Sequence, residues 1–169
     1  YSTNTFPTWR LAQPFRMLAH NGEINTIKGN TNWMKSHETR AISEIFGEYN
    51  SEIFPLIEPD VSDSMALDSV TEALVHAGRS IPSAHCMVIP EAWSHRQHLP
   101  TSHRDFFAYC NCVIEPWDGP AAIAASDGRW VIAGMDRNGL RPLRYTITQG
   151  GLLIVGSESG MVPMHESEV

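Results

Sequence analysis

Short apolar runs separated by polar turns mark the first fifty residues of the chain. The run FRMLA at residues 15–19 is followed by His-Asn-Gly, which predicts a strand that ends in a tight turn at Asn21 and Gly22. Further along, apolar side chains in rough helical spacing predict a helix over residues 33–46, and Gly47 is expected to end it.

The middle of the chain contains its clearest helical pattern, SDSMALDSVTEALVHAG at residues 62–78. Leu67, Val70 and Leu74 recur at the spacing of one helix face. Asp63 stands at the amino-terminal end, where the helix dipole favours a carboxylate. The pattern therefore predicts an amphipathic helix that packs against a core.

Beyond this helix the pattern is less regular. The run HCMVI at residues 85–89 predicts a buried strand, and the His- and Pro-rich residues 90–104 predict a loop. We interpret DFFAYCNCVIE at residues 105–115 as a helix, against the strand preference of its aromatic and β-branched residues.

The last third of the chain has the pattern of β-structure. Apolar runs at residues 120–126 and 129–136 flank an Asp-Gly pair, which is a strong hairpin signal. Two more strands are predicted at residues 141–148 and 152–158, after an Asn-Gly turn and around a Gln-Gly-Gly turn. Helices followed by an antiparallel meander predict an α+β domain.

Composition limits the classes of function. With 169 residues, 42% of them hydrophobic, and no apolar run near the roughly 20 residues of a membrane span, we expect one soluble domain and no membrane contact. The net charge of −7, without a basic patch, argues against nucleic acid as a partner. Three cysteines suit a reducing, cytoplasmic setting. Because the chain opens on Tyr1 rather than Met, we expect a piece of a longer polypeptide.

Several candidate chemistries have a plainer interpretation. His95, His98 and His103 have spacings that a metal could use, but a solvated loop explains them better. Cys110 and Cys112 lie in an apolar run, which favours buried core thiols over nucleophiles. The chain contains neither a dinucleotide-binding nor a phosphate-binding glycine motif.

Asp63 and the Asn21-Gly22 pair each allow two interpretations. Asp63 could complement its own helix end, or it could hold the ammonium group of a ligand. Asn21-Gly22 favours a hairpin turn, but the following residues 23–29 do not alternate like a returning strand. A turn that opens into a polar loop would expose the Asn carboxamide and the Gly N–H, two donors suited to an oxyanion.

The motifs together resemble a known family. QPF, LAHNGEINT, the SDS that opens a helix, DRNGLRPLRY and VGSES, in this order, are similar to the class II glutamine amidotransferase domain of the N-terminal-nucleophile hydrolases. The segments NTFPTW and GNTNWM favour the glutamate synthase branch, whose large subunit carries such a domain. The resemblance covers residues 1–169, which would form part of a single four-layer αββα sandwich that is incomplete at its N-terminal side.

The resemblance implies roles for four residues. In the family, the Asn side chain and Gly backbone of the HNG motif form the oxyanion hole, which maps onto Asn21 and Gly22. The aspartate of the family's DS motif, here Asp63, holds the α-amino group of L-glutamine, and Thr3 would line the same pocket. The sequence alone leaves DRNGLRPLRY as a structural corner, with Arg137, Arg141 and Arg144 serving buried carboxylates or a domain interface.

The resemblance also implies what lies beyond the chain. The nucleophilic cysteine and the arginine that binds the glutamine carboxylate would precede Tyr1, so the fragment alone is expected to be inactive. The intact enzyme would pass ammonia to a synthase domain of the same polypeptide, which reductively aminates 2-oxoglutarate. FMN, an iron-sulfur cluster and an electron-donor subunit or ferredoxin are implied for that enzyme, and no cofactor for this segment.

Alternatives stay open at this point. Another class II amidotransferase, of the amidophosphoribosyltransferase, glucosamine-6-phosphate synthase or asparagine synthetase type, shares the HNG, DS and RP elements. A non-catalytic regulatory domain could keep the same fold. The expected location is the cytoplasm, or a plastid in a photosynthetic eukaryote.

Overall fold

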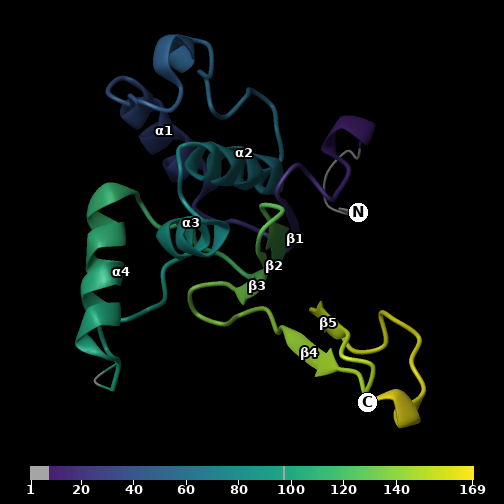
Figure 1. The fold of residues 1–169 in the computed structure, drawn as a ribbon. Helices are drawn as coiled ribbons and strands as arrows, with labels where there is room; N and C mark the ends of the chain where they lie inside the picture. Colours follow the sequence, from purple (N-terminus) through teal and green to yellow (C-terminus); the bar gives the residue numbers. More distant parts are fainter. Residues whose placement is uncertain (1–7, 97) are drawn as a thin grey trace.

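Two separate antiparallel sheets organise the computed structural model of the protein, which describes residues 8–96 and 98–169 (Figure 1). Within these residues, the strands are β1 (Leu18–Gly22), β2 (Ala121–Ser126), β3 (Val131–Met135), β4 (Arg144–Ile147) and β5 (Leu153–Gly156). The α-helices are α1 (Ile27–Glu38), α2 (Asp63–His76), α3 (Ile81–Val88) and α4 (Thr101–Val113). The expected mixture of helix and sheet is therefore confirmed.

The three-stranded sheet has the order β1-β2-β3. β2 and β3 form the hairpin that the Asp-Gly signal predicts, with Ser126 opposite Val131. β1 pairs with β2, which lies about a hundred residues further along, and places Asn21 opposite Ala122 and Gly22 opposite Ala121. Asn21 and Gly22 therefore end a strand, and the predicted tight turn is wrong because the partner strand is distant in sequence.

Helices cover one side of this sheet, and the hydrophobic core lies between the helices and the sheet (Figure 1). α2 is in contact with β1 and α3, and α4 packs on α3. The largest fully buried side chains come from both layers and include Trp117, Ile24, Leu67, Ile81 and Met87. Burial of these side chains is the main stabilising contribution to this part of the fold.

α2 confirms the clearest sequence prediction. Its N-cap is Ser62, whose hydroxyl accepts a hydrogen bond from the Met65 N–H at 3.1 Å. Gly78 follows the helix with a φ of +97°, a conformation that glycine adopts at helix ends without a steric penalty.

The other helices differ from their predictions. The helix expected over residues 33–46 is α1, which begins at Ile27 and ends at Glu38, before the apolar residues 41–46. Residues 85–88 of the strand expected at 85–89 belong to α3, and Ile89 is its C-cap, because a short, mostly apolar run fits a buried helix as well as a buried strand. The helix expected at residues 105–115 is α4, which begins earlier, at Thr101.

Among the described residues, β4 and β5 pair only with each other, so the predicted continuous meander is wrong. A turn does follow β3, but hydrogen bonds to Asp136 shape it so that the chain leaves the first sheet. The buried Asp136 carboxylate accepts N–H bonds from Ala121, Asn138, Leu140 and Arg141 at 2.8–3.1 Å. These bonds fix residues 136–141 as a tight loop rather than as a hairpin.

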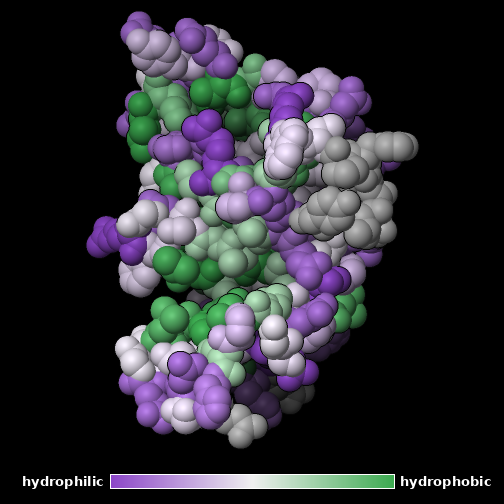
Figure 2. Space-filling view, turned by 90° about the vertical axis from the view of Figure 1, so that its right-hand side faces the viewer, coloured by the Kyte–Doolittle hydropathy of each residue, from purple (hydrophilic) through white to green (hydrophobic). Residues whose placement is uncertain are grey.

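The surface around β4 and β5 is notably apolar. Tyr145, Ile147, Leu152 and Leu153 are each more than half exposed. Figure 2 shows hydrophobic residues at the surface in its lower part, where these strands lie. No helix in the described ranges is long and apolar enough to cross a membrane.

Candidate functional site

The candidate site lies at the end of β1. On the side of β1 that faces away from β2, the Gln13 side chain covers His20. The Gln13 carboxamide accepts the His20 N–H at 2.6 Å and donates to the His20 carbonyl at 2.9 Å. Both backbone groups of His20 therefore point away from β2. Gln13 thus makes the two hydrogen bonds that a neighbouring strand would make at the residue before Asn21.

Gly22 presents an N–H group at the same edge. Backbone groups along an antiparallel strand alternate between facing the partner strand and facing away from it. His20 faces away, and the Glu23 N–H donates to the Pro120 carbonyl on the β2 side at 2.9 Å. The alternation therefore turns the Gly22 N–H away from β2, toward the open edge of the sheet.

The position of Gly22 requires glycine. Its φ is +152°, and a Cβ built there would lie 1.9 Å from the Pro120 carbonyl oxygen. No side chain fits at that distance from a backbone atom. The close approach of the two strands therefore fixes the direction of the Gly22 N–H.

The side chain of Asn21 reaches the second sheet. Its Nδ2 donates to the Ser157 hydroxyl, directly after β5, at 2.8 Å. Asn21 itself is exposed, whereas Ser157 is buried. The carboxamide thus lies between the end of β1 and the end of β5.

Asp63, the first residue of α2, turns toward β1. Its Oδ2 accepts the Ile24 N–H at 2.7 Å, while Ser62 caps the helix. Asp63 as a residue is partly exposed. The neighbouring Ser64 hydroxyl lies 2.7 Å from Nδ1 of His20, which connects the start of α2 to the HNG segment.

His20 is a buried polar side chain between these groups. Burial lowers its pKa below the ordinary value, and this effect outweighs the Asp63 carboxylate and the Pro120 carbonyl, which favour the charged form. Arg141 lowers the pKa further. His20 is therefore neutral at physiological pH. Its Nε2 has no hydrogen-bond partner within the described residues.

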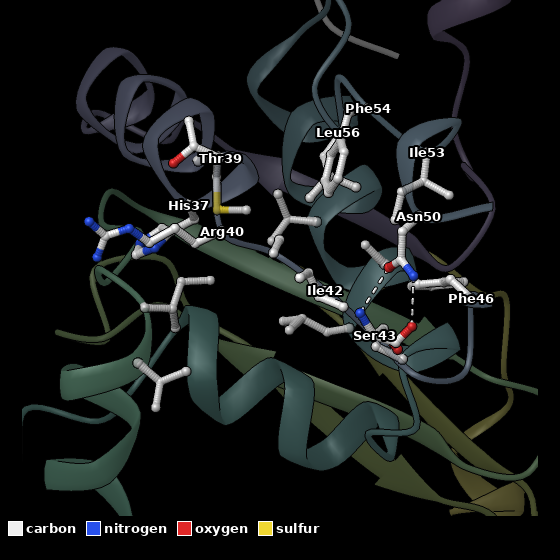
Figure 3. Close-up of a pocket in the computed structure, with 18 of the residues that line it drawn as sticks. His37, Thr39, Arg40, Ile42, Ser43, Phe46, Asn50, Ile53, Phe54 and Leu56 are labelled. Carbon is white, nitrogen blue, oxygen red and sulfur yellow. Dashed lines mark hydrogen bonds between the residues drawn. The ribbon is translucent and has the colours of Figure 1, made fainter. Parts of the chain in front are cut away.

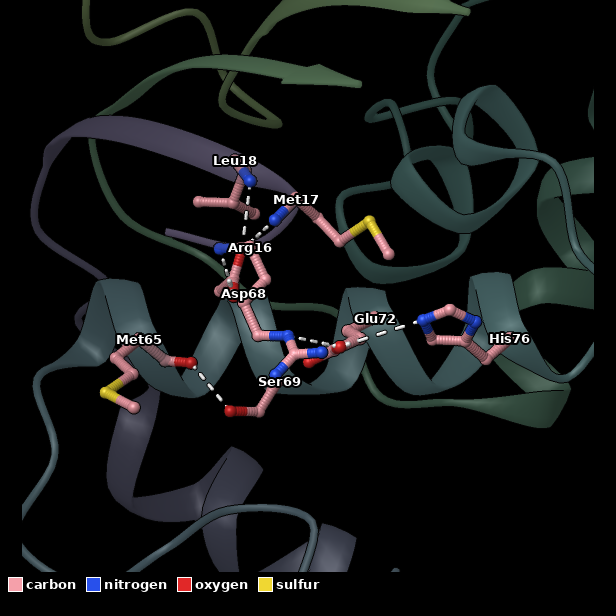
Figure 4. Close-up of polar contacts among 8 residues, drawn as sticks. All are labelled: Arg16, Met17, Leu18, Met65, Asp68, Ser69, Glu72 and His76. Carbon is pink, nitrogen blue, oxygen red and sulfur yellow. Dashed lines mark hydrogen bonds and ion pairs between the residues drawn. The ribbon is translucent and has the colours of Figure 1, made fainter. Parts of the chain in front are cut away.

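A second carboxylate of α2 anchors the beginning of β1. Asp68, which is buried, accepts the N–H groups of Arg16, Met17 and Leu18 at 2.9–3.2 Å (Figure 4). Arg16 also pairs with Glu72 one turn further along α2. With Asp63 binding the Ile24 N–H, α2 holds the β1 segment on both sides of Asn21 and Gly22.

We call the place where the ends of β1 and β5 meet the corner. A cavity of about 280 Å³ lies there. It is lined by Pro120, Leu140, Arg141, Pro142, Ser157 and Glu158. Nε of Arg141 is buried there without a hydrogen bond in the described part of the chain. The Asp136 loop, by orienting residues 140–142, forms one wall of this cavity.

A larger cavity, of about 730 Å³, lies away from the candidate site. It lies between the end of α1, the segment at residues 39–56 and α2, and is lined mostly by apolar side chains such as Ile42, Phe46 and Leu56 (Figure 3). Asn50 bonds to Ser43 at its edge. None of the residues named for the candidate site lines it.

The cysteines lie on the far helices. Cys110 is buried, as expected, but Cys112 is exposed, because residues two apart on a helix face different sides. Burial raises the pKa of the thiols of Cys86 and Cys110, which keeps both protonated at neutral pH. The described residues include no group of three His, Cys, Asp or Glu side chains that could hold a metal ion.

The structure brings three of the four sequence-predicted site residues to one corner. Asn21 and Gly22 lie at the end of β1, and Asp63 binds the residue that follows them. Thr3 lies outside the described residues. Sequence reasoning did not identify Gln13, His20, Ser64, Asp68 or Ser157. All five stand in or beside the quoted motifs, but the contacts of Ser157 with Asn21 and of Asp68 with residues 16–18 join positions far apart in the sequence.

Comparison with known proteins shows the family to which the sequence belongs. The family model of the class II glutamine amidotransferases matches residues 1–169. The chain is 60% identical to the glutamate synthase [NADPH] large chain of Azospirillum brasilense and 46% identical to that of Bacillus subtilis, over its full length. It is 48% identical to a chloroplastic ferredoxin-dependent glutamate synthase of Oryza sativa subsp. japonica. It spans about 11% of the length of these relatives.

Proposed function

Because the chain belongs to the class II glutamine amidotransferases, we propose that its corner site hydrolyses L-glutamine as part of a glutamate synthase. The observation that carries the proposal is the pair of donors at the end of β1. The Gly22 N–H faces the open edge, and the Asn21 carboxamide projects beside it. Two preorganised neutral donors stabilise the negative charge that develops on an amide oxygen under attack.

Asp63 supplies the binding half of the site. The carboxylate of this partly exposed residue at the start of α2, held in place by the Ile24 N–H, is suited to pair with the α-ammonium group of glutamine. Neutral His20 beside it adds no positive charge that would repel this ammonium. Thr3 remains an expectation from the family resemblance.

The nucleophile must come from another part of the polypeptide. Cys86, Cys110 and Cys112 lie on α3 and α4, and none of them contributes to the corner. In the proposed reaction, a thiol attacks the side-chain amide carbon of glutamine and its proton passes to the leaving nitrogen, so that ammonia departs. Water then cleaves the thioester to glutamate and returns the thiol. The chain alone is then inactive because it carries the oxyanion donors without the attacking group.

The arrangement of helices and sheets supports the proposed four-layer αββα fold. One helical layer backs the sheet β1-β2-β3, and Asn21 projects to the side where β5 supplies Ser157. This order of helix, sheet and second sheet is consistent with part of a four-layer αββα domain that includes residues 1–169. The exposed apolar side chains around β4 and β5 would be covered by the remainder of that domain.

The whole protein would pass the ammonia to a synthase domain that forms glutamate from 2-oxoglutarate. Its electron donor would be a partner of the NADPH or ferredoxin type that the names of the relatives indicate. FMN and an iron-sulfur cluster are the cofactors that the family resemblance implies for the intact enzyme, and we propose that they bind outside this chain. We place the intact enzyme in the cytoplasm or a plastid.

The test uses the intact polypeptide. Asn21→Ala should lower the rate of glutamine hydrolysis by roughly 10²–10³-fold, since one oxyanion donor is lost. Asn111→Ala, an exposed Asn on α4, is the matched control and should keep the native rate. Full glutaminase activity of the Asn21 variant would overturn the assignment.

A second variant tests the binding role. Asp63→Asn should raise the KM for glutamine by about tenfold or more, because a neutral amide pairs poorly with an ammonium group. Asp105→Asn, on the exposed face of α4, serves as the control. An unchanged KM would return Asp63 to a structural role as the acceptor of the Ile24 N–H. Glutamate formation from glutamine and 2-oxoglutarate distinguishes a glutamate synthase from other amidotransferases.

A further inference from the structure

Ser157 is the buried polar contact of the proposed oxyanion donor. It directly follows β5, and its hydroxyl oxygen accepts a hydrogen bond from Nδ2 of Asn21 at 2.8 Å. The two residues are 136 positions apart in sequence. Ser157 is only 7% exposed, although Asn21 beside it is exposed to solvent.

A carboxamide nitrogen carries two hydrogens, and the bond to Ser157 uses one of them. The second hydrogen makes no other bond within the described residues. An exposed Asn side chain would otherwise rotate about its two side-chain torsions, and its oxygen would face the substrate as often as its nitrogen. A fixed acceptor on one side removes this freedom.

We propose that Ser157 is a positioning residue that orients the Asn21 carboxamide, so that its second N–H points at the oxyanion formed from glutamine. This inference rests on the proposed function. The Ser157 hydroxyl touches neither substrate nor reacting atoms, and its effect on the reaction passes through Asn21. The second sheet therefore contributes to the reaction at the end of β1.

The surroundings of Ser157 support a fixed position. Gly156, the preceding residue, pairs with Arg144 in the β4-β5 ladder, and β5 is in contact with β2. Ser157 also lines the cavity of about 280 Å³ at the corner, together with Pro120 and Arg141. A buried hydroxyl on a paired strand end loses little additional freedom when it binds Asn21.

The test compares Ser157→Thr with Ser157→Val in the intact polypeptide. Threonine and valine have nearly the same shape, so the pair isolates the hydroxyl from any effect of added volume. We expect kcat for glutamine hydrolysis to be about tenfold lower in the valine variant than in the threonine variant, the usual effect of one hydrogen bond. The KM for glutamine should be equal in both, because the oxyanion exists only in the transition state.

A double variant tests whether the effect passes through Asn21. In an Asn21→Ala background, exchanging threonine for valine at position 157 should cause no further loss of kcat. A loss of the same size in both backgrounds would overturn the positioning role. So would an equal kcat for the two single variants, or a difference confined to KM.

The outcomes separate this inference from the proposed function. If Asn21→Ala keeps the full glutaminase rate, the proposed function fails and the role of Ser157 with it. If Asn21→Ala is slow but the threonine and valine variants turn over equally, only the role of Ser157 fails. Hydrogen exchange of β5 should be the same in both variants, which checks that the second sheet is intact.

Discussion

The helix-backed sheet and the β4-β5 hairpin meet at the same corner, but they are stabilised differently. Strands β1 to β3 lie against a continuous apolar core supplied by α2, α3 and the segment around Trp117. The hairpin contributes no residue to that core, and Tyr145 and Ile147 on β4 are largely exposed. Polar contacts, among them the bond between Asn21 and Ser157, therefore contribute to holding the hairpin against the first sheet.

This difference explains why carboxylates are so important at the corner. Asp68 ties β1 to α2 on the core side, and Asp136 ties the start of the hairpin to β2. Each is buried, and each accepts several backbone N–H groups that would otherwise lack partners. Asn21 and Ser157 then meet across the boundary between the two regions.

The largest effect is expected from Gly22→Ala. A Cβ there overlaps the Pro120 carbonyl and requires a φ that alanine avoids, which together should cost about 4 kcal/mol of unfolding free energy. Hydrogen exchange should accelerate in β1 and β2, and glutamine hydrolysis by the intact polypeptide should fall at least 10²-fold. Native protection and turnover would contradict the close approach of the two strands.

Asp68→Ala should affect the helix-backed sheet alone. The N–H groups of residues 16–18, one buried and two partly buried, lose their acceptor, which should cost about 3 kcal/mol. Amide exchange should increase at the start of β1, while the β4-β5 pairs keep their protection. Asp105→Ala on the surface of α4 is the control, and its stability should stay within about 0.5 kcal/mol of native.

Asp136→Asn should affect the hairpin instead. Burial opposes ionisation of Asp136, but the four N–H bonds outweigh it and hold the pKa of the carboxyl below its usual value. The charged form thus stabilises the fold above the unfolded-state pKa, and this contribution is lost as pH falls through the lower folded value. The asparagine variant should lose about 2 kcal/mol at pH 7.

The pH dependence gives a second check on Asp136. The difference in stability between native protein and the Asn variant should shrink as pH falls below about 4, because the unfolded chain then takes up a proton at Asp136 before the folded protein does. Exchange of the β4-β5 amides, followed from pH 7 to pH 3, measures this difference. A constant difference over that range would show that the bonds to the N–H groups do not depend on charge.

Local signals predicted the elements whose structure depends on nearby residues. The capping residues and apolar periodicity of residues 62–78 predict α2, and the Asp-Gly pair predicts the β2-β3 hairpin. The wrong predictions have two sources: distant contacts, and the ambiguity of short apolar runs such as residues 85–89, most of which form a helix rather than a strand. The partner strand of Asn21 and Gly22 lies near residue 121, so a dipeptide that favours turns ends a strand instead.

The candidate site shows the same limit. Asn21, Gly22 and Asp63 belong to motifs that stand out in the sequence, and the structure places them at one corner. The residues that hold them could not be identified from the sequence. Ser157 follows a strand of the other sheet, and Asp68 lies one turn beyond Asp63 on α2, where the helical pattern gives no sign of its contact with β1. No spacing rule connects positions 21 and 157.

The smallest effect is expected at the glycine of α1, and it has the opposite sign to that at Gly22. Gly29 lies inside the helix, and a Cβ there would meet no atom within 4 Å. Alanine restricts the unfolded chain and favours helix, so Gly29→Ala should add up to about 1 kcal/mol of stability and slow amide exchange along α1. A loss of stability in the intact polypeptide would mean that another segment approaches this face of α1 closely. The two substitutions make the same chemical change, so the opposite signs would show that strand pairing, rather than glycine itself, imposes the requirement at Gly22.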